Sequence, residues 1–427
     1  MKLLIKNGRV IDPRSKTDET LDILIDNGKI ADLKAKIESK EAVLVDASRL
    51  VVAPGFIDMH VHLREPGQEH KETIETGTRA AARGGFTSIC AMPNTDPVND
   101  CREVTEYILG QAAKRAIVNV HPIGAITKGL AGAELTDMAD QVAAGVVAFS
   151  DDGQCVQNSR VMWRALEYSK FLSTLIIDHC QDEPLSEDGV MHEGRASYQF
   201  GLPGIPAAAE NIMIARDIIL SESLGTRIHI AHLSTRGAVQ LVREAKRRNL
   251  KVSAEATPHH LILHDGYLEN YETSYKVNPP LRSPEDVQVL TNAVKDGTVD
   301  VFATDHAPHA AEEKDVELDK APFGMVGLET AVSLLLDRIV NKNVISLPRF
   351  IEMISANPAQ LLGLKNKGKI AVGADADLTI LNLHKEVVVD INAFQSKAKN
   401  SPFQGWKLKG VPVMTIVAGR VVYPFAP

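Results

Sequence analysis

The sequence predicts an α/β protein: a (β/α)8 TIM-like barrel with a small β-sandwich domain formed by both termini. Two observations predict this fold. The middle of the chain alternates short apolar runs with helix-compatible stretches, and both ends show strand patterns separated by turn residues. The chain has 427 residues, of which 44% are hydrophobic, and this is enough for a barrel of about 250 residues and a second core.

The two ends of the chain are expected to form one domain. Near the N-terminus, apolar runs flank Asn7-Gly8 and Asn27-Gly28, and Asn-Gly between apolar runs is a strong hairpin signal. Strand patterns near the C-terminus cover residues 376–383, 387–391 and 411–422, with Ala418-Gly419 as a turn. Because short strands need partners to bury a face, we expect residues 1–53 and 365–427 to pair into a composite β-sandwich.

The middle of the chain, residues 54–364, is expected to be the barrel and the catalytic domain. Stretches such as 74–83 and 210–223 have helical patterns and lie between the apolar runs. Repeated strand–helix alternation implies parallel strands with right-handed crossovers, and eight such units imply a closed barrel. The eight apolar runs are residues 55–61, 87–92, 117–123, 145–149, 174–178, 227–231, 251–254 and 300–303.

Composition excludes several classes of protein. The net charge is −8 and no basic domain is visible, which argues against nucleic-acid binding. No apolar run approaches the roughly 18 residues of a membrane span, and the N-terminal apolar stretch is too short for a signal peptide. Four cysteines without a CxxC pair are too few for a disulfide scaffold. We therefore expect a cytoplasmic protein that contacts neither nucleic acid nor membrane.

Histidines and aspartates follow five of the predicted strands. His60 and His62 lie two residues apart, so both imidazoles point to the same side of a strand. Histidines with only structural roles would not be expected to gather at the same end of five strands, whereas the carboxyl ends of barrel strands carry active sites. The remaining candidates are Asp151 or Asp152, His179, His232 and Asp305.

This ligand set predicts a metal centre and hydrolytic chemistry. Six imidazole and carboxylate groups exceed one tetrahedral site, and they suit two ions that share a carboxylate. Zn²⁺ is favoured, one or two per chain with two preferred, and Co²⁺, Mn²⁺ or Fe²⁺ stay open. The expected reaction is metal-assisted hydrolysis at a carbonyl, or its reverse, with Asp305 as both ligand and proton carrier. The residues alone do not choose between Asp151 and Asp152.

Other polar residues at the same mouth fit the capture of a substrate carboxylate. Arg64, Asn94, Asn278 and His309 offer hydrogen-bond donors, although a surface ion pair or a turn would also explain each one alone. Glu255 is expected to contact the ligands without binding the metal itself. The charged stretch 312–320 is a solvated loop or a mobile lid over the mouth.

Eight motifs resemble those of the dihydroorotases in the amidohydrolase superfamily. The most discriminating pair is PGFIDMHVHLREPG at 54–67 and ATDHAPH at 303–309. The others are AMPNT at 91–95, FSDDG at 149–153, DHC at 178–180, IHIAHLST at 228–235, TPHHL at 257–261 and GKIAVGADADLTIL at 368–381. The resemblance implies the reversible cyclisation of N-carbamoyl-L-aspartate to L-dihydroorotate and water in de novo pyrimidine (UMP) biosynthesis.

The resemblance also assigns roles to residues. It implies that His60, His62 and Asp305 bind one zinc ion, that His179 and His232 bind the second, and that Asp152 bridges them. It implies a metal-bound hydroxide, with Asp305 as general acid and base. The implied substrate contacts are Arg64, Asn94, Asn278, His309 and the backbone of Phe323 and Gly324.

One departure separates the chain from hydantoinases and allantoinases. Those relatives bridge their metals with a carboxylated lysine, but the FSDDG motif at 149–153 has no lysine and is similar to a bacterial dihydroorotase branch that uses aspartate. Another cyclic amidohydrolase and a non-catalytic interaction homologue are the alternatives. We further expect a homodimer, and aspartate transcarbamoylase is a candidate partner because this enzyme would use its product.

Overall fold

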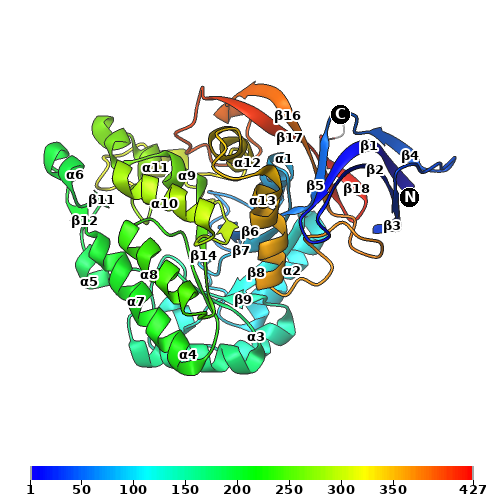
Figure 1. Cartoon of the computed structure of the whole chain (residues 1–427). Coiled ribbons are helices and arrows are strands. Elements are labelled where there is room, and N and C mark those ends of the chain that lie inside the picture. Colours follow the sequence, from blue (N-terminus) through cyan, green and yellow to red (C-terminus); the bar gives the residue numbers. More distant parts are fainter. Residues whose placement is uncertain (1, 426–427) are drawn as a thin grey trace.

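The protein consists of a barrel and a sheet made from the two ends of the chain, placed side by side (Figure 1). This computed structural model describes residues 2–425. In Figure 1 the terminal strands lie at the upper right, and the barrel with its helices occupies the centre and left.

The barrel contains eight parallel strands, as the sequence predicts. Its hydrogen-bonded order is the order of the chain, and the first and last strands meet where the His62 N–H donates to the His306 carbonyl at 2.9 Å. Each strand coincides with one of the eight predicted apolar runs. The strands are β6 (Phe56–Val61), β7 (Phe86–Ala91), β8 (Asn119–Gly124), β9 (Ala148–Phe149), β10 (Ile176–Asp178), β13 (Ile228–Ile230), β14 (Val252–Ala256) and β15 (Val301–Phe302).

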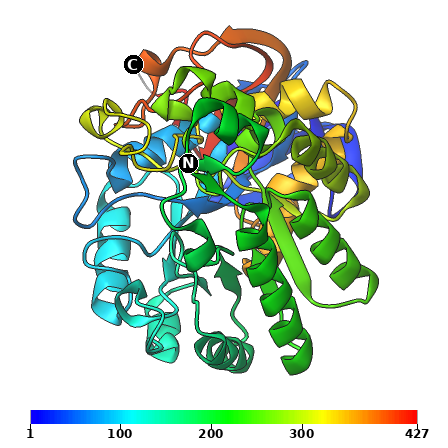
Figure 2. The same cartoon turned by 90° about the vertical axis from the view of Figure 1, so that its left-hand side faces the viewer.

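Helices connect the barrel strands and lie outside them (Figures 1 and 2). Those of the crossovers are α1 (Ile74–Gly84), α2 (Arg102–Arg115), α3 (Met138–Ala144), α4 (Ser159–Leu172), α7 (Ala207–Leu224), α8 (Arg236–Arg247) and α10 (Pro284–Asp296). After the last barrel strand come α12 (Ala331–Leu335), α13 (Leu347–Ile351) and α14 (Asn357–Leu361). Shorter elements in the loops are α5 (Glu183–Ser186), α6 (Arg195–Phe200), α9 (Pro258–Ile262), α11 (Ala311–Lys314) and the strand pair β11 (Met191–His192) and β12 (Gly204–Ile205).

Helix α1 shows how local sequence sets these boundaries. Thr73 begins it with a capping box, in which its side chain accepts the N–H of Thr76. Gly85 ends it with a φ of 92°, a left-handed conformation that costs glycine little. The preceding Gly84 is needed for a different reason, because a Cβ there would lie 2.1 Å from the Leu328 carbonyl oxygen.

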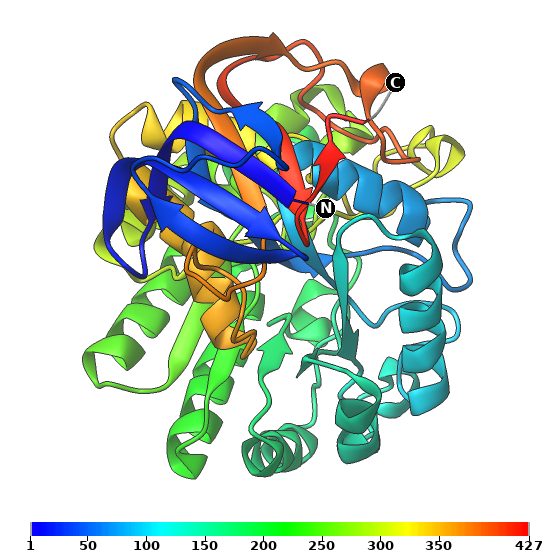
Figure 3. The ribbon, with the colours of Figure 1, turned by 90° about the vertical axis from the view of Figure 1, so that its right-hand side faces the viewer.

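The ends of the chain pair with each other, as expected. Hydrogen bonds join all the terminal strands into one sheet in the order β18-β17-β16-β5-β1-β2-β3, with β4 beside β1 (Figure 3). The expected sandwich thus takes the form of one continuous sheet with an apolar core of its own. The strands are β1 (Lys2–Asp12), β2 (Thr17–Asp26), β3 (Lys29–Lys34), β4 (Val43–Asp46), β5 (Val51–Pro54), β16 (Leu378–Val388), β17 (Lys407–Val417) and β18 (Arg420–Tyr423).

One predicted turn is wrong. Asn27-Gly28 and Ala418-Gly419 do join neighbouring strands, but Asn7-Gly8 lies inside β1 at a shift in register. The neighbouring strand β2 pairs with β1 on both sides of this irregularity, so the chain continues where the local signal favours a hairpin. Gly8 is required by packing, since a Cβ there would lie 2.6 Å from Val52 Cγ2.

The chain leaves the terminal sheet between β5 and β6 and returns to it after α14. Leu362 packs with the barrel residues Ile57 and Met59, whereas Ile370 packs in the core of the terminal sheet. These contacts support the boundaries that we propose, with 54–364 as the barrel domain and 1–53 plus 365–427 as the composite domain. Among the helices of residues 2–425, none combines the length and the apolar character needed to cross a lipid bilayer.

Candidate metal centre and active site

All six predicted ligands come together at the carboxyl ends of the barrel strands, and each is less than one tenth exposed. The fold brings the first and last strands of the barrel into contact through Asp58. Its carboxylate accepts the N–H groups of His60 and of Thr304, both at 3.1 Å, so β6 is tied to the segment that carries Asp305. Three of the predicted site residues have a left-handed backbone, namely Arg64 (φ 61°), His232 (φ 28°) and Asp305 (φ 48°). Such strain is typical of functional sites.

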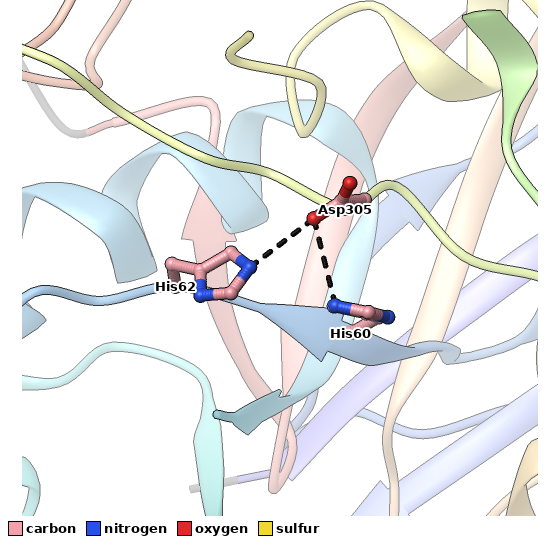
Figure 4. A group of neighbouring side chains, drawn as sticks. All are labelled: His60, His62 and Asp305. Carbon is pink, nitrogen blue, oxygen red and sulfur yellow. Dashed lines mark hydrogen bonds and ion pairs between the residues drawn. The ribbon is translucent and has the colours of Figure 1, made fainter. Parts of the chain in front are cut away.

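His60, His62 and Asp305 form the first group of candidate ligands (Figure 4). The Oδ1 atom of Asp305 lies 3.1 Å from His62 Nε2 and 3.5 Å from His60 Nε2. His60 lies on β6, His62 follows it, and Asp305 comes from the segment after β15. The two imidazoles therefore face one carboxylate across the seam of the barrel.

Asp152 connects this group to the second pair of histidines. Its Oδ1 lies 3.1 Å from His60 Nε2 and its Oδ2 lies 3.4 Å from His62 Nε2. His179 Nδ1 lies 2.9 Å from His232 Nε2 and 3.9 Å from Asp152 Oδ1. His60, Asp152 and His232 satisfy the geometry of a second ligand group, which shares His60 with the first.

The structure separates the two neighbouring aspartates that the sequence could not. Asp151 turns away from the histidines, and its Oδ1 accepts the N–H groups of Ile126 and Thr127 at 2.7 and 3.0 Å. The Thr127 hydroxyl donates to its other oxygen. Asp152 alone is left to face the cluster.

Three buried carboxylates surround His60 and set its charge. Burial by itself would lower the pKa of His60, but Asp152, Asp305 and Glu255 outweigh burial and raise this pKa well above its ordinary value. Burial likewise would raise the pKa of Asp152 and of Glu255, but His60 overrides it and the pKa of each stays below its ordinary range. The three carboxylates thus favour a positive charge at this point, and a bound cation would take the place of the His60 proton.

The pKa of His232 is shifted in the opposite direction from that of His60. Burial and the neighbouring His179 lower the pKa of His232 to about 3, so its imidazole is neutral at physiological pH. A neutral imidazole is the form that binds metals.

The unpaired atoms of the cluster fit a divalent metal. His60 Nε2, Asp152 Oδ1 and His232 Nδ1 are buried, and none of them makes a hydrogen bond of suitable geometry among the described residues, although His60 Nε2 and Asp152 Oδ1 lie 3.1 Å apart. Buried polar atoms without partners are costly unless another group satisfies them. Imidazole nitrogen together with carboxylate oxygen is a donor set for a divalent cation such as Zn²⁺.

Glu255 supports the ligands from behind, as expected. Its Oε1 accepts a hydrogen bond from His60 Nδ1 at 2.7 Å and from the His232 N–H at 3.3 Å, and its Oε2 lies 3.1 Å from His229 Nε2. This contact orients the His60 ring so that Nε2 faces the cluster. A carboxylate in this position is a common partner of ligating histidines.

A cavity of about 240 Å³ opens above the cluster. Every predicted site residue lines it except His60, which lies beneath. Arg64 contacts the Pro308 carbonyl through Nε at 3.2 Å and approaches His309 Nε2 at 3.5 Å. Burial, and then Arg64, lower the pKa of His309 to about 3, so Arg64 brings the positive charge to this wall.

Two asparagines and one glycine of the predicted substrate set also have partners within the protein. Asn94 Oδ1 accepts a hydrogen bond from His62 Nδ1 at 2.8 Å, and Asn278 Nδ2 lies 3.3 Å from His179 Nε2. The Gly324 N–H donates to the Lys276 carbonyl at 2.8 Å, and is therefore engaged in this conformation. The two asparagines thus help to orient His62 and His179 as well as to line the cavity.

Comparison with known proteins adds independent information. Residues 48–238 match the family model described as dihydro-orotase-like, and residues 322–423 match that of the amidohydrolase family. A curated dihydroorotase of Pelotomaculum thermopropionicum is 54% identical over 99% of this chain and 98% of its own length. The chain belongs to the dihydroorotase family. A further dihydroorotase, from Acetivibrio thermocellus, is 49% identical over 98% of both chains.

Solved structures share the fold of this dihydroorotase family member. An L-hydantoinase (dihydropyrimidinase) from Arthrobacter aurescens superposes with a TM-score of 0.89 at 29% identity, over 98% of this chain and 95% of the other. A D-hydantoinase superposes with a TM-score of 0.87 at 27% identity, over 99% and 95% of the two chains. Hydantoinases are thus more distant relatives than the dihydroorotases.

Sequence reasoning missed two residues, Glu72 and Asn400, near this dihydroorotase-family site. Glu72 contacts His306 Nε2 at 3.3 Å, and Asn400 contacts the cavity wall from the segment between β16 and β17. Neither lies at the end of a barrel strand near the ligands, so the strand-end pattern could not have found them.

The stretch 312–320 is fastened to the protein by Lys276, whose Nζ donates to the Leu318 carbonyl at 2.7 Å.

Proposed function

We propose that this member of the dihydroorotase family interconverts N-carbamoyl-L-aspartate and L-dihydroorotate as a step of pyrimidine biosynthesis. One observation carries the proposal. A chain that is 54% identical to a dihydroorotase over nearly its whole length gathers six buried imidazole and carboxylate groups beneath a cavity with a buried arginine. The enzyme is a hydrolase that acts on a cyclic amide.

We further propose that the site holds two zinc ions. His60, His62 and Asp305 would hold one ion, His179 and His232 would hold the other, and Asp152 would contact both. The position of Asp152 supports this division, because its Oδ1 lies 3.1 Å from His60 Nε2 and 3.9 Å from His179 Nδ1, one histidine of each group. A divalent metal, when bound, polarises a carbonyl group and makes a nucleophile available near neutral pH.

Asp305 is the residue that we assign to proton transfer. The pKa of Asp305 stays below its ordinary range because its histidine neighbours override the effect of burial, so the group is ionised, which is the state that a proton acceptor needs. In the hydrolytic direction it would take a proton from the attacking water and pass it to the ring nitrogen as the C–N bond breaks. In the direction of ring closure Asp305 would take the proton from the ureido nitrogen and pass it to the departing carboxylate oxygen, and one further proton from the solvent completes the water that leaves.

Arg64 and His309 are proposed to hold the carboxylate that does not react. Arg64 is buried, and a guanidinium binds carboxylates in a fixed geometry. Because a buried charge beside the cavity attracts an anion strongly, this contact orients the ring carbonyl toward the ligand cluster.

A comparison of substrates tests the function. The purified, metal-loaded enzyme is assayed with dihydroorotate, hydantoin and allantoin at equal concentrations, and metal per chain is measured on the same sample. We expect dihydroorotate to be turned over far faster than the other two and the metal content to approach two per chain. Preferential turnover of hydantoin would assign the chain to the alternative activity.

Several finer expectations stay predictions. They are the homodimer, the partnership with aspartate transcarbamoylase and the cytoplasmic location. Size-exclusion chromatography of the enzyme alone and with that transcarbamoylase tests the first two, with activity measured in both samples. We expect the enzyme alone to elute at the mass of a dimer. We expect it to co-elute with the transcarbamoylase, and its activity to change in that sample.

A further inference from the structure

The segment between β16 and β17 belongs to the composite domain, yet it contacts the mouth of the barrel. Its Ser396 hydroxyl and its Lys397 N–H both donate to the Glu72 carboxylate, and Glu72 also contacts His306. Figure 2 shows this orange segment at the top of the molecule, beside the olive and yellow loops that follow β15. The segment is therefore anchored next to the chain that carries Asp305.

Asn400 is the residue through which this segment contacts the cavity wall. Its Nδ2 donates to the carbonyl oxygens of Ala307 at 3.2 Å and Gly324 at 3.1 Å, and its Oδ1 accepts the His309 N–H at 3.2 Å. Its main-chain carbonyl accepts the Val326 N–H at 3.0 Å. Asn400 is 7% exposed, so water does not replace these contacts readily.

The three residues held by the Asn400 side chain all line the cavity, and they come from two loops. Ala307 and His309 follow β15, whereas Gly324 lies after the charged stretch 312–320. The loops also contact each other, because His309 Nε2 donates to the Phe323 carbonyl at 2.8 Å. A planar amide with two donors and one acceptor satisfies all three backbone groups at once.

We propose that Asn400 is a positioning residue that holds the substrate-facing wall of the cavity at His309 and Gly324. This inference rests on the proposed function, because it takes dihydroorotate as the ligand of that wall. Asn400 contacts none of the six metal ligands in the described structure, so its effect is on substrate affinity and not on metal binding. A displacement of a positioning group by about 1 Å can cost up to about 100-fold in rate or affinity.

Two substitutions separate positioning from general stability. Asn400→Ala removes all three side-chain contacts. Asn400→Asp keeps the size and the acceptor, but it sets a carboxylate oxygen against the carbonyls of both Ala307 and Gly324. Asn392→Ala is the matched control, since Asn392 lies in the same segment, is exposed and lines none of the cavity.

Steady-state kinetics with dihydroorotate, metal content and thermal unfolding are measured for the holoenzyme and the three variants. We expect both Asn400 variants to raise KM by about tenfold or more, to lower kcat by less than about threefold, and to keep the wild-type metal content. Asn392→Ala should match the wild type.

Unchanged KM values in the folded Asn400 variants would overturn the inference. A loss of metal or of the folded state in both variants would also overturn it, because that result assigns Asn400 to stability. The failure of the proposed function looks different, since the wild-type enzyme itself would then not turn over dihydroorotate.

Discussion

Replacing Glu255 with glutamine tests how far the metal centre depends on residues that do not bind the metal. The carboxylate of Glu255 is fully buried and contacts His60 Nδ1, His229 Nε2 and the His232 N–H at 2.7, 3.1 and 3.3 Å. Glutamine has nearly the same size and keeps one acceptor. It removes the negative charge, and its amide group must face one of the two imidazoles.

The expected loss follows from these contacts. A hydrogen bond with an ionised partner contributes roughly 1.5–3 kcal/mol, about twice the value for neutral partners. Exchanging the charge-assisted contact with His60 for a neutral one should therefore cost about 1.5 kcal/mol, which is about tenfold in metal affinity. If the contact of residue 255 with His229 is lost as well, the loss of metal affinity would approach 100-fold, the upper end of the usual range for residues that hydrogen-bond metal ligands.

Alanine would be a poorer test at this position. It would leave three buried donors without an acceptor, at roughly 1–3 kcal/mol each, and this threatens the fold itself. Metal affinity is measured by titration of the chelator-treated protein with Zn²⁺ in a competing chelator. Glu329→Gln serves as the control, because Glu329 has a buried side chain that bonds the Gln395 and Ser396 N–H groups and contacts no ligand.

The reasoning would be refuted if Glu255→Gln bound Zn²⁺ within twofold of the wild-type affinity. It would also be refuted if Glu329→Gln lost metal to the same extent, since the effect would then reflect any buried carboxylate.

Three further predictions concern the reaction and the metal-free protein. Asp305→Asn should reduce kcat for dihydroorotate by at least about 100-fold while part of the metal stays bound, as measured by turnover and metal analysis; near-normal turnover would remove Asp305 from proton transfer. Arg64→Ala should raise KM for N-carbamoyl-L-aspartate about tenfold or more because a buried charged contact is lost, and an unchanged KM would place the substrate carboxylate elsewhere. The third prediction concerns chelator-treated protein, in which protonated His60 stabilises the fold because its pKa is higher in the folded state than in the unfolded state. This stabilisation is complete below the unfolded histidine pKa of about 6.5, and it is lost as the pH rises toward and through the folded-state pKa of His60. The thermal midpoint of the metal-free protein should accordingly fall as the pH rises above about 7, whereas a midpoint that rises with pH would contradict the charge assignment.

Patterns of neighbouring residues were sufficient to predict most of the fold. The eight apolar runs form the eight barrel strands, because a short apolar segment is stabilised by burial in the core whatever its sequence neighbours are. Asn7-Gly8 shows where such reasoning fails. The same dipeptide is a turn at Asn27-Gly28, but at residues 7 and 8 the pairing of β1 with β2 on both sides outweighs the local preference.

The convergence of the six candidate ligands was predictable for a related reason. Parallel barrel strands all end at the same face, so His60, His179 and Asp305 had to approach one another once the barrel was recognised. Their distances and protonation were not predictable, because these depend on carboxylates from other strands. The raised pKa of His60 requires Asp152, Asp305 and Glu255 within a few ångströms of one ring.

The amino-acid sequence by itself determined which strands form, which face of the barrel carries chemistry and which side chains are present there, because these are local properties of the chain. Tertiary structure alone decided that Asp152 and not Asp151 faces the histidines, and that Asn400 reaches the cavity from another domain. The physical reason is the same in both cases. The direction of a polar side chain is set by the backbone groups that pair with it, and those groups lie far away along the chain.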